Sequence, residues 1–196
     1  VQGTNLFVGG SFERAGAVTA TNIAKWDGSS WFPLGAGVGD KFSSVLDMAA
    51  NGSDLYVAGS FKKAGDIPVS YVARWNGSAW SPLHDAGVHN GISGGVYALA
   101  SDGTYLYAGG SFTRAGKVPV RNIARFDGTT WDSLGGGIGG GFVESGSTYL
   151  PVVYAIAVTD SIVYVGGQFR EAGGVLAHDI AQWNGTSWSA VGSGIT

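Results

Sequence analysis

Few side chains of this chain could hold a metal ion or move a proton, and the three histidines are the first candidates. His84 and His89 lie close together in the sequence, with Asp85 beside the first of them. A protein zinc site needs three or four ligands, and nothing marks a further ligand in this segment. His178 stands far from the other two. The sequence therefore predicts no metal site and no cofactor.

Carboxylates are the second candidates, because a glycosidase needs two of them on either side of the bond that it cleaves. The acids outside predicted turns and repeated positions form no recognisable pair. They are Glu13, Asp40, Asp47, Asp66, Asp85, Glu144 and Glu171. The chain contains no cysteine, which excludes thiol catalysis, disulfides and Cys-ligated metals. We therefore expect no catalytic residue and no enzyme.

The elements that position these side chains come from an internal repeat. Four similar segments, LFVGGSF, LYVAGSF, LYAGGSF and VYVGGQF, begin 49, 51 and 57 residues apart. Each is followed by an Ala-Gly pair, by an apolar run that ends in an aromatic residue and, five residues later, by a tryptophan. These aromatic positions are Trp26, Trp75, Phe126 and Trp183, and then Trp31, Trp80, Trp131 and Trp188.

Each unit reads as four short strands. The second strand is the Leu-Tyr-Val-Gly-Gly run, the third is an apolar run such as residues 23–26, and the fourth begins at the tryptophan. An Asp-Gly or Asn-Gly pair, the strongest short-range hairpin signal, separates the third strand from the fourth. A first strand precedes these in three copies, at residues 45–49, 96–100 and 153–157.

Two prolines fix the outer edge of the unit. Proline lacks the donor for a ladder hydrogen bond, so Pro33 and Pro82 place the fourth strand at the edge of its sheet. Four-stranded units with a period of ~40–50 residues are typical of β-propellers. We predict an all-β protein, a β-propeller segment of four-stranded antiparallel blades whose first blade lacks its inner strand. We expect the segment to belong to a larger propeller, built from further blades or from two copies. Its repeats are residues 1–44, 45–95, 96–152 and 153–196.

The residue pattern of the repeat resembles those of known repeat families. A double glycine that ends the second strand, followed by an aromatic residue and a tryptophan across a hairpin, resembles the kelch motif, with a shorter turn before the tryptophan. The succession Gly-Gly-Ser-Phe, Ala-Gly, Ile-Ala-Arg-Trp-Asp-Gly is also similar to repeats of secreted bacterial surface proteins and of fungal cortical cell-polarity marker ectodomains. The resemblance covers the whole chain and implies an extracellular or cell-wall setting. Those relatives share no single reaction, so it implies no particular activity.

Residues that recur in every unit are interpreted as scaffold. The tryptophans are expected to pack between blades rather than to form a stacking platform for sugars or bases, since every blade needs the same filler. No helix follows the glycine pairs, so they form no phosphate cradle and instead allow close backbone approach or a bulge in the second strand. Basic residues recur before the third strand, as solvated loop charges or as a cationic ring for an acidic ligand. They are Arg14, Lys63, Arg114 and Arg170.

Residues that break the repeat gather in the connections between units. These connections, residues 37–44, 85–95 and 135–152, vary most in length. Loops without a scaffold role are where binding residues usually lie. The predicted ligand-binding residues on this loop face are Lys41, Phe42, His84, His89, Asn90, Phe142, Glu144 and Tyr149.

Charge and hydropathy narrow the possible partners. A net charge of -3 with scattered Lys and Arg predicts no nucleic-acid partner. No apolar run approaches the ~20 residues of a membrane span. We expect a non-catalytic extracellular or cell-surface module that binds a protein or carbohydrate ligand through the long connections. One alternative is a structural building block or spacer that associates with identical copies, and another is a glycan-active hydrolase or lyase.

Overall fold

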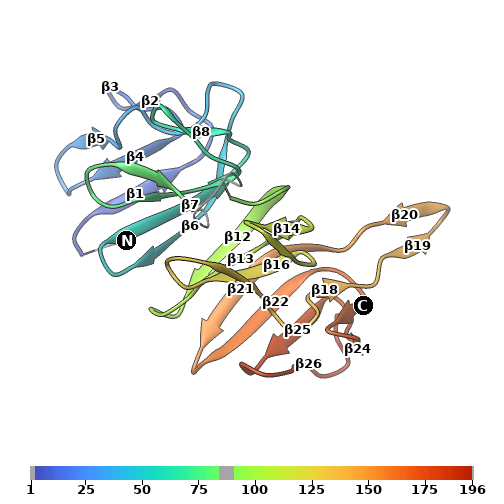
Figure 1. Cartoon of the computed structure of the whole chain (residues 1–196). Helices are drawn as coiled ribbons and strands as arrows, with labels where there is room; N and C mark the ends of the chain where they lie inside the picture. Colours follow the sequence, from blue (N-terminus) through green and yellow to red (C-terminus); the bar gives the residue numbers. More distant parts are fainter. Residues whose placement is uncertain (1–2, 84–90, 196) are drawn as a thin grey trace.

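The structure, a computed structural model, describes residues 3–83 and 91–195. Within these ranges every regular element is a β-strand, as the sequence predicts. The main strands form four antiparallel sheets that follow one another along an arc, with the first and fourth sheets at opposite ends (Figure 1). We call these sheets units 1 to 4 in chain order.

Each unit is a meander in which neighbours in sequence pair in space. Unit 1 has β1 (Leu6–Gly9), β4 (Ile23–Trp26) and β5 (Trp31–Pro33). Unit 2 has β6 (Val45–Asn51), β7 (Asp54–Gly59), β10 (Val72–Trp75) and β11 (Trp80–Pro82). Unit 3 has β12 (Gly95–Ser101), β13 (Leu106–Ser111), β16 (Ile123–Phe126) and β17 (Trp131–Ser133). Unit 4 has β21 (Val152–Thr159), β22 (Ile162–Gln168), β25 (Ile180–Trp183) and β26 (Trp188–Ala190).

The inner and outer edges of the units are as predicted. The first strands β6, β12 and β21 contact one another around the inside of the arc. Strands β5 and β11, which end at Pro33 and Pro82, lie at the outer edges. This radial arrangement of four-stranded antiparallel sheets is that of consecutive β-propeller blades, which confirms the predicted fold class. Among the residues that the structure describes, unit 1 has three strands and no inner one.

No strand is predicted from the sequence in the connection between the second and third strands of each unit. In the structure this connection folds into a small hairpin of two two-residue strands. These hairpins are β2 (Arg14–Ala15) with β3 (Val18–Thr19), β8 (Lys63–Ala64) with β9 (Ile67–Pro68), β14 (Arg114–Ala115) with β15 (Val118–Pro119), and β23 (Glu171–Ala172) with β24 (Val175–Leu176). The last connection between units adds β18 (Ile138–Gly139), β19 (Phe142–Glu144) and β20 (Ser147–Tyr149).

The glycine pairs confirm close backbone approach and correct the position of the bulge. A Cβ on Gly59, Gly110 or Gly167 would overlap a carbonyl oxygen at the start of the inner strand. The register shifts in the inner strand itself, for example between Val96 and Ala98 of β12. The extra residue therefore bulges in the first strand, and the glycine of the second strand makes room for it.

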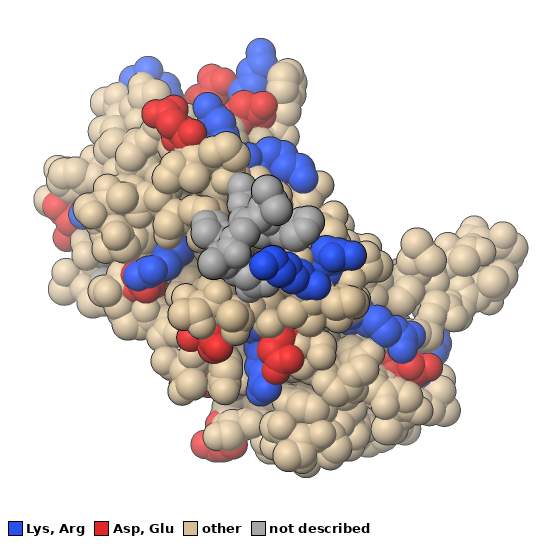
Figure 2. Space-filling model, in the orientation of Figure 1, with Lys and Arg blue, Asp and Glu red and all other residues tan. Residues whose placement is uncertain are grey.

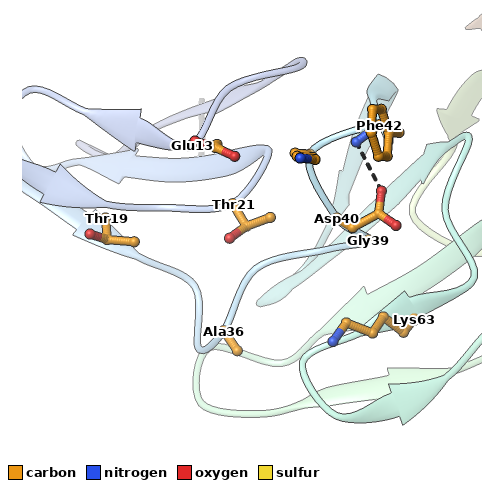
Figure 3. A pocket seen from close by; sticks show the side chains of 9 residues that line it. Glu13, Thr19, Thr21, Ala36, Gly39, Asp40, Phe42 and Lys63 are labelled. Carbon is orange, nitrogen blue, oxygen red and sulfur yellow. Dashed lines mark hydrogen bonds between the residues drawn. The ribbon is translucent and has the colours of Figure 1, made fainter.

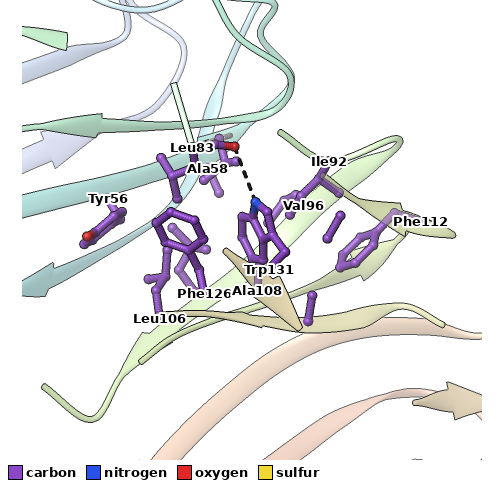
Figure 4. Packing of buried hydrophobic residues seen from close by; sticks show 14 of the residues in the cluster. Tyr56, Ala58, Leu83, Ile92, Val96, Leu106, Ala108, Phe112, Phe126 and Trp131 are labelled. Carbon is purple, nitrogen blue, oxygen red and sulfur yellow. Dashed lines mark hydrogen bonds between the residues drawn. The ribbon is translucent and has the colours of Figure 1, made fainter. Parts of the chain in front are cut away.

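The hydrophobic core lies between units, and tryptophans fill it. Trp80, Trp131 and Trp188 are only 3–6% exposed. Their indole N–H groups donate to the carbonyls of the preceding unit's Leu34, Leu83 and Leu134, at 2.8, 3.3 and 2.8 Å. Figure 4 shows Trp131 within the cluster of buried residues at the junction of units 2 and 3, with its bond to Leu83. Trp80, Trp131 and Trp188 are therefore filler between blades, as predicted, whereas Trp31 of unit 1 is half-buried.

A second contact joins each unit to the next through the backbone. We call the residues that follow each outer strand the exit segment: 34–38, 134–138 and 191–195, and in unit 2 the described residues 83, 91 and 92. In the first three units the exit segment pairs with the small hairpin of the next unit. The paired residues are Val38 and Ala64, Ile92 and Ala115, and Ile138 and Ala172. Every internal junction therefore combines an indole hydrogen bond with an antiparallel backbone bridge.

Candidate functional site

A hollow on the face that carries the small hairpins lies at the junction of units 1 and 2. Its volume is ≈ 570 Å³, and Figure 3 shows the side chains around it. A second hollow of ≈ 430 Å³ shares Gly39, Asp40 and Lys63 with it, so the two form one extended cleft. The main hollow is lined by Glu13, Thr19, Thr21, Ala36, Gly39, Asp40, Lys41, Phe42 and Lys63.

Asp40 forms the centre of this cleft as the acceptor of a tight turn. Its Oδ1 accepts hydrogen bonds from the Phe42 amide at 2.9 Å and from the Ser43 hydroxyl at 3.0 Å. The hydrogen bond from the Phe42 amide, followed by that from Ser43, lowers the pKa of the Asp40 carboxyl. The carboxylate is therefore ionised at neutral pH and available to accept hydrogen bonds from a ligand.

Buried Asn22, just before β4, holds the backbone of this loop. Its backbone has a φ of 63°, a left-handed conformation that Asn tolerates better than most residues. Its Nδ2 donates to the carbonyls of Val38 and Asp40 at 2.8 and 2.7 Å, and its Oδ1 accepts from the Phe12 amide at 3.1 Å. Asn122 repeats this arrangement at the junction of units 3 and 4, where its Nδ2 donates to the Ile138 carbonyl.

Replacing Asn22 with alanine is expected to lower the free energy of unfolding by about 2–3 kcal/mol, because buried backbone groups lose their partners. It should also loosen residues 38–40, which amide hydrogen exchange measures. Asn122→Ala is the matched control, because it removes the corresponding donor to the Ile138 carbonyl at the junction of units 3 and 4 and should leave the protection of residues 38–40 unchanged. Equal protection of residues 38–40 in the Asn22→Ala variant and in the unaltered chain would contradict the role of Asn22.

Charged and apolar groups meet at the rim of the cleft. Phe42 is 84% exposed, and the Lys41 ammonium lies 5.0 Å from the centre of its ring. Lys63 reaches the cleft from β8 of the next unit, and Glu13 borders it next to β2 (Figure 3). On the face drawn in Figure 2, basic and acidic side chains form small mixed groups separated by uncharged surface. The cleft thus offers donors, acceptors and one apolar ring.

A second group of predicted residues lies at the junction of units 3 and 4, on a hairpin that projects from the molecule (Figure 1). The rings of Phe142 and Tyr149 stack with their centroids 5.0 Å apart and an interplanar angle of 16°. The Arg170 guanidinium lies 4.1 Å from the centre of the Phe142 ring and is held by Asp179 at 2.7 Å. Glu144 is exposed near the end of the hairpin.

The structure therefore does not gather the predicted binding residues into one site. Lys41 and Phe42 border the cleft between units 1 and 2, while the stacked aromatic pair belongs to another junction. His84, His89 and Asn90 lie outside the described residues.

Sequence reasoning did not select the residues that complete the cleft. Asp40 and Glu13 appeared only as unpaired acids, and Lys63 only as a recurring basic residue. A repeat in the sequence could have identified Asn22. The residue just before the third strand is Asn22 in unit 1, Asn122 in unit 3 and Asp179 in unit 4.

Among residues 3–83 and 91–195, no three His, Cys, Asp or Glu side chains gather where a metal ion could bind. The same described part of the chain contains no helix that is long and apolar enough to cross a membrane.

Comparison with known proteins gives a likeness in shape alone. No protein-family profile matches the chain. No curated protein matches it in sequence. Among solved structures, that of YCF48 bound to D1 peptide is similar, with a TM-score of 0.47 and 13% sequence identity over 92% of this chain. The match covers 47% of that structure, so the chain spans about half its length.

Proposed function

We propose that this chain is a non-catalytic, kelch-like propeller module of the extracellular space or cell surface. It binds a glycan in the cleft between units 1 and 2. The observation that supports this most is the lining of the cleft, where Asp40, Lys63 and the exposed ring of Phe42 surround one hollow. Sugars present hydroxyl groups to carboxylates and ammonium groups, and their apolar faces lie against aromatic rings.

The lowered pKa of Asp40 bears on which role this residue could take in a glycosidase. Glu13 and Asp40 border the same hollow, as the two carboxylates of a glycosidase would. A general acid needs a raised pKa, whereas hydrogen bonds from the Phe42 amide and the Ser43 hydroxyl lower that of Asp40. Asp40 is thus suited to accept hydrogen bonds rather than to protonate a leaving group.

A glycan array probed with the labelled 196-residue chain tests this function, followed by calorimetry with the best ligand. Lys63→Ala and Phe42→Ala should each weaken binding at least about tenfold. Arg114→Ala is the matched control, because Arg114 begins β14 as Lys63 begins β8 and should leave binding unchanged. Binding to no glycan, or equal losses in all three variants, would overturn the proposal, and cleavage of the glycan would favour the hydrolase alternative.

A second function, that of a self-associating building block, is favoured by a different observation. The outer faces of units 1 and 4 expose groups whose equivalents are buried at the internal junctions. Ile195 is 59% exposed, whereas Val38 and Ile138, in the same place of their exit segments, are 1% and 0% exposed.

A further inference from the structure

Unit 1 presents one half of an internal junction. Trp31 is half-buried, and no acceptor for its indole N–H lies among the described residues, whereas Trp80 donates to Leu34. The amide of Gly16 likewise has no partner in the described part of the chain. Its equivalent Gly65 donates to the Gly37 carbonyl of the preceding unit at 2.7 Å. Unit 1 therefore carries unused donors in the positions that join the other units.

Unit 4 presents the other half, already folded. The Val191 carbonyl accepts a hydrogen bond from the Gly194 amide at 3.1 Å. In unit 1 the Leu34 carbonyl accepts the equivalent bond from the Gly37 amide at 3.0 Å, so the two segments form the same turn. The Ile195 amide donates to the His178 carbonyl at 3.0 Å. The same bond holds Val38 to Thr21 at 3.1 Å and Ile138 to Arg121 at 2.8 Å.

The exit segment of unit 4 is thus shaped before any neighbour binds it. This pre-organisation lowers the entropic cost of association, because the segment is not ordered on binding. The exposed side chain of Ile195 also gains apolar burial, as Val38 does beneath the next unit. Unit 1 of another copy supplies both a matching shape and the donors that have no partner among the described residues.

We propose that two copies of this chain join head to tail, with unit 1 of one copy docked on unit 4 of the other. The Trp31 indole donates to the Val191 carbonyl of the second copy. The Gly16 amide donates to its Gly194 carbonyl, and Ala15 pairs opposite its Ile195. These are the contacts that the three internal junctions repeat. The inference deepens the building-block function and does not depend on glycan binding.

Cysteine cross-linking tests the predicted pairing directly, because the chain has no cysteine of its own. A chain with Ala15→Cys is mixed with a chain with Ile195→Cys under mild oxidation. Residues opposite each other in an antiparallel pair have Cα atoms ~4.5–5.5 Å apart, within the range that a disulfide spans. A covalent dimer of the two different chains is the expected product.

Two further pairs of cysteine substitutions serve as the positive and the negative control for this cross-link. Val38→Cys with Ala64→Cys in one chain reports the internal version of the same contact and should close within that chain. Ala15→Cys mixed with Val143→Cys reports random collision, since Val143 is 69% exposed on the projecting hairpin. If the internal pair closes and the pair at 15 and 195 forms no more dimer than the Val143 pair, the proposal is wrong.

Sedimentation of the unmodified chain provides an independent measurement. We expect dimers or longer head-to-tail assemblies that dissociate on dilution, and Ile195→Asp should raise the dissociation constant at least about tenfold. Because Ile195 is exposed, this variant should keep its circular dichroism spectrum. It should also keep glycan binding, which separates failure of this contact from failure of the cleft. A single-chain mass at tens of micromolar would overturn the proposal.

Discussion

Replacing Trp131 with alanine is expected to lower the free energy of unfolding by ~3–5 kcal/mol, a large part of a domain's total stability. Its ring is 3% exposed and packs 5.0 Å from the ring of Phe126, centre to centre, at the junction of units 2 and 3. The substitution leaves a cavity between two units and removes the donor to the Leu83 carbonyl. Both losses fall on the same junction.

Urea denaturation followed by circular dichroism measures this effect, with Trp31→Ala as the matched control. Trp31 occupies the same position of the repeat but is half-buried, and its indole lacks an acceptor among the described residues. At a concentration low enough to keep copies apart, Trp31→Ala should cost less than half as much as Trp131→Ala. Equal losses would mean that the tryptophans act within their own units rather than between them.

Gly110→Ala is expected to destabilise unit 3 by about 3 kcal/mol or more, the upper range for overpacking a core. The added Cβ would overlap the carbonyl oxygen of Gly95 and approach the Cα of Val96, both on the inner strand β12. Backbone on both sides must then move, and the ladder between β12 and β13 must weaken. The soluble yield and the urea midpoint report this effect.

Gly10 offers the control for that substitution, because it holds the same place in unit 1, where the inner strand is missing. The nearest atom to a Cβ on Gly10 is a Phe12 ring carbon at 3.6 Å, an ordinary contact. Gly10→Ala should therefore change stability by less than about 0.5 kcal/mol. If both alanines are tolerated equally, the glycine is not required by the inner strand.

The sequence predicted the parts of the fold that rest on repeated local chemistry. Tryptophan spacing and an Asp-Gly or Asn-Gly turn recur in each unit, and prolines mark the outer edges of units 1 and 2, so four sheets and their packing follow from them. In the turn after β4, the Asp27 carboxylate accepts from the amides of Ser29 and Ser30, a bond set by residues a few positions apart. Structure that depends on residues so close in the chain can be predicted from one sequence alone.

What the sequence could not predict depends on contacts between distant residues or on very short elements. The small hairpins have strands of two residues, too short for any alternation of apolar and polar side chains. Asn22 acts on the carbonyl of Asp40, 18 positions away in the next connection. The cleft is completed by Lys63 from another unit, so loop composition alone could not separate Lys41 from the distant Phe142.

The pairing of each exit segment with the following hairpin has a consequence for how the chain folds. These pairings join each unit to the next one along the chain, so the described units form a one-dimensional array. The free energy of unfolding of such an array is approximately the sum of the contributions of its units and of the junctions between them. Such an array can nucleate in any unit and propagate from it to its neighbours.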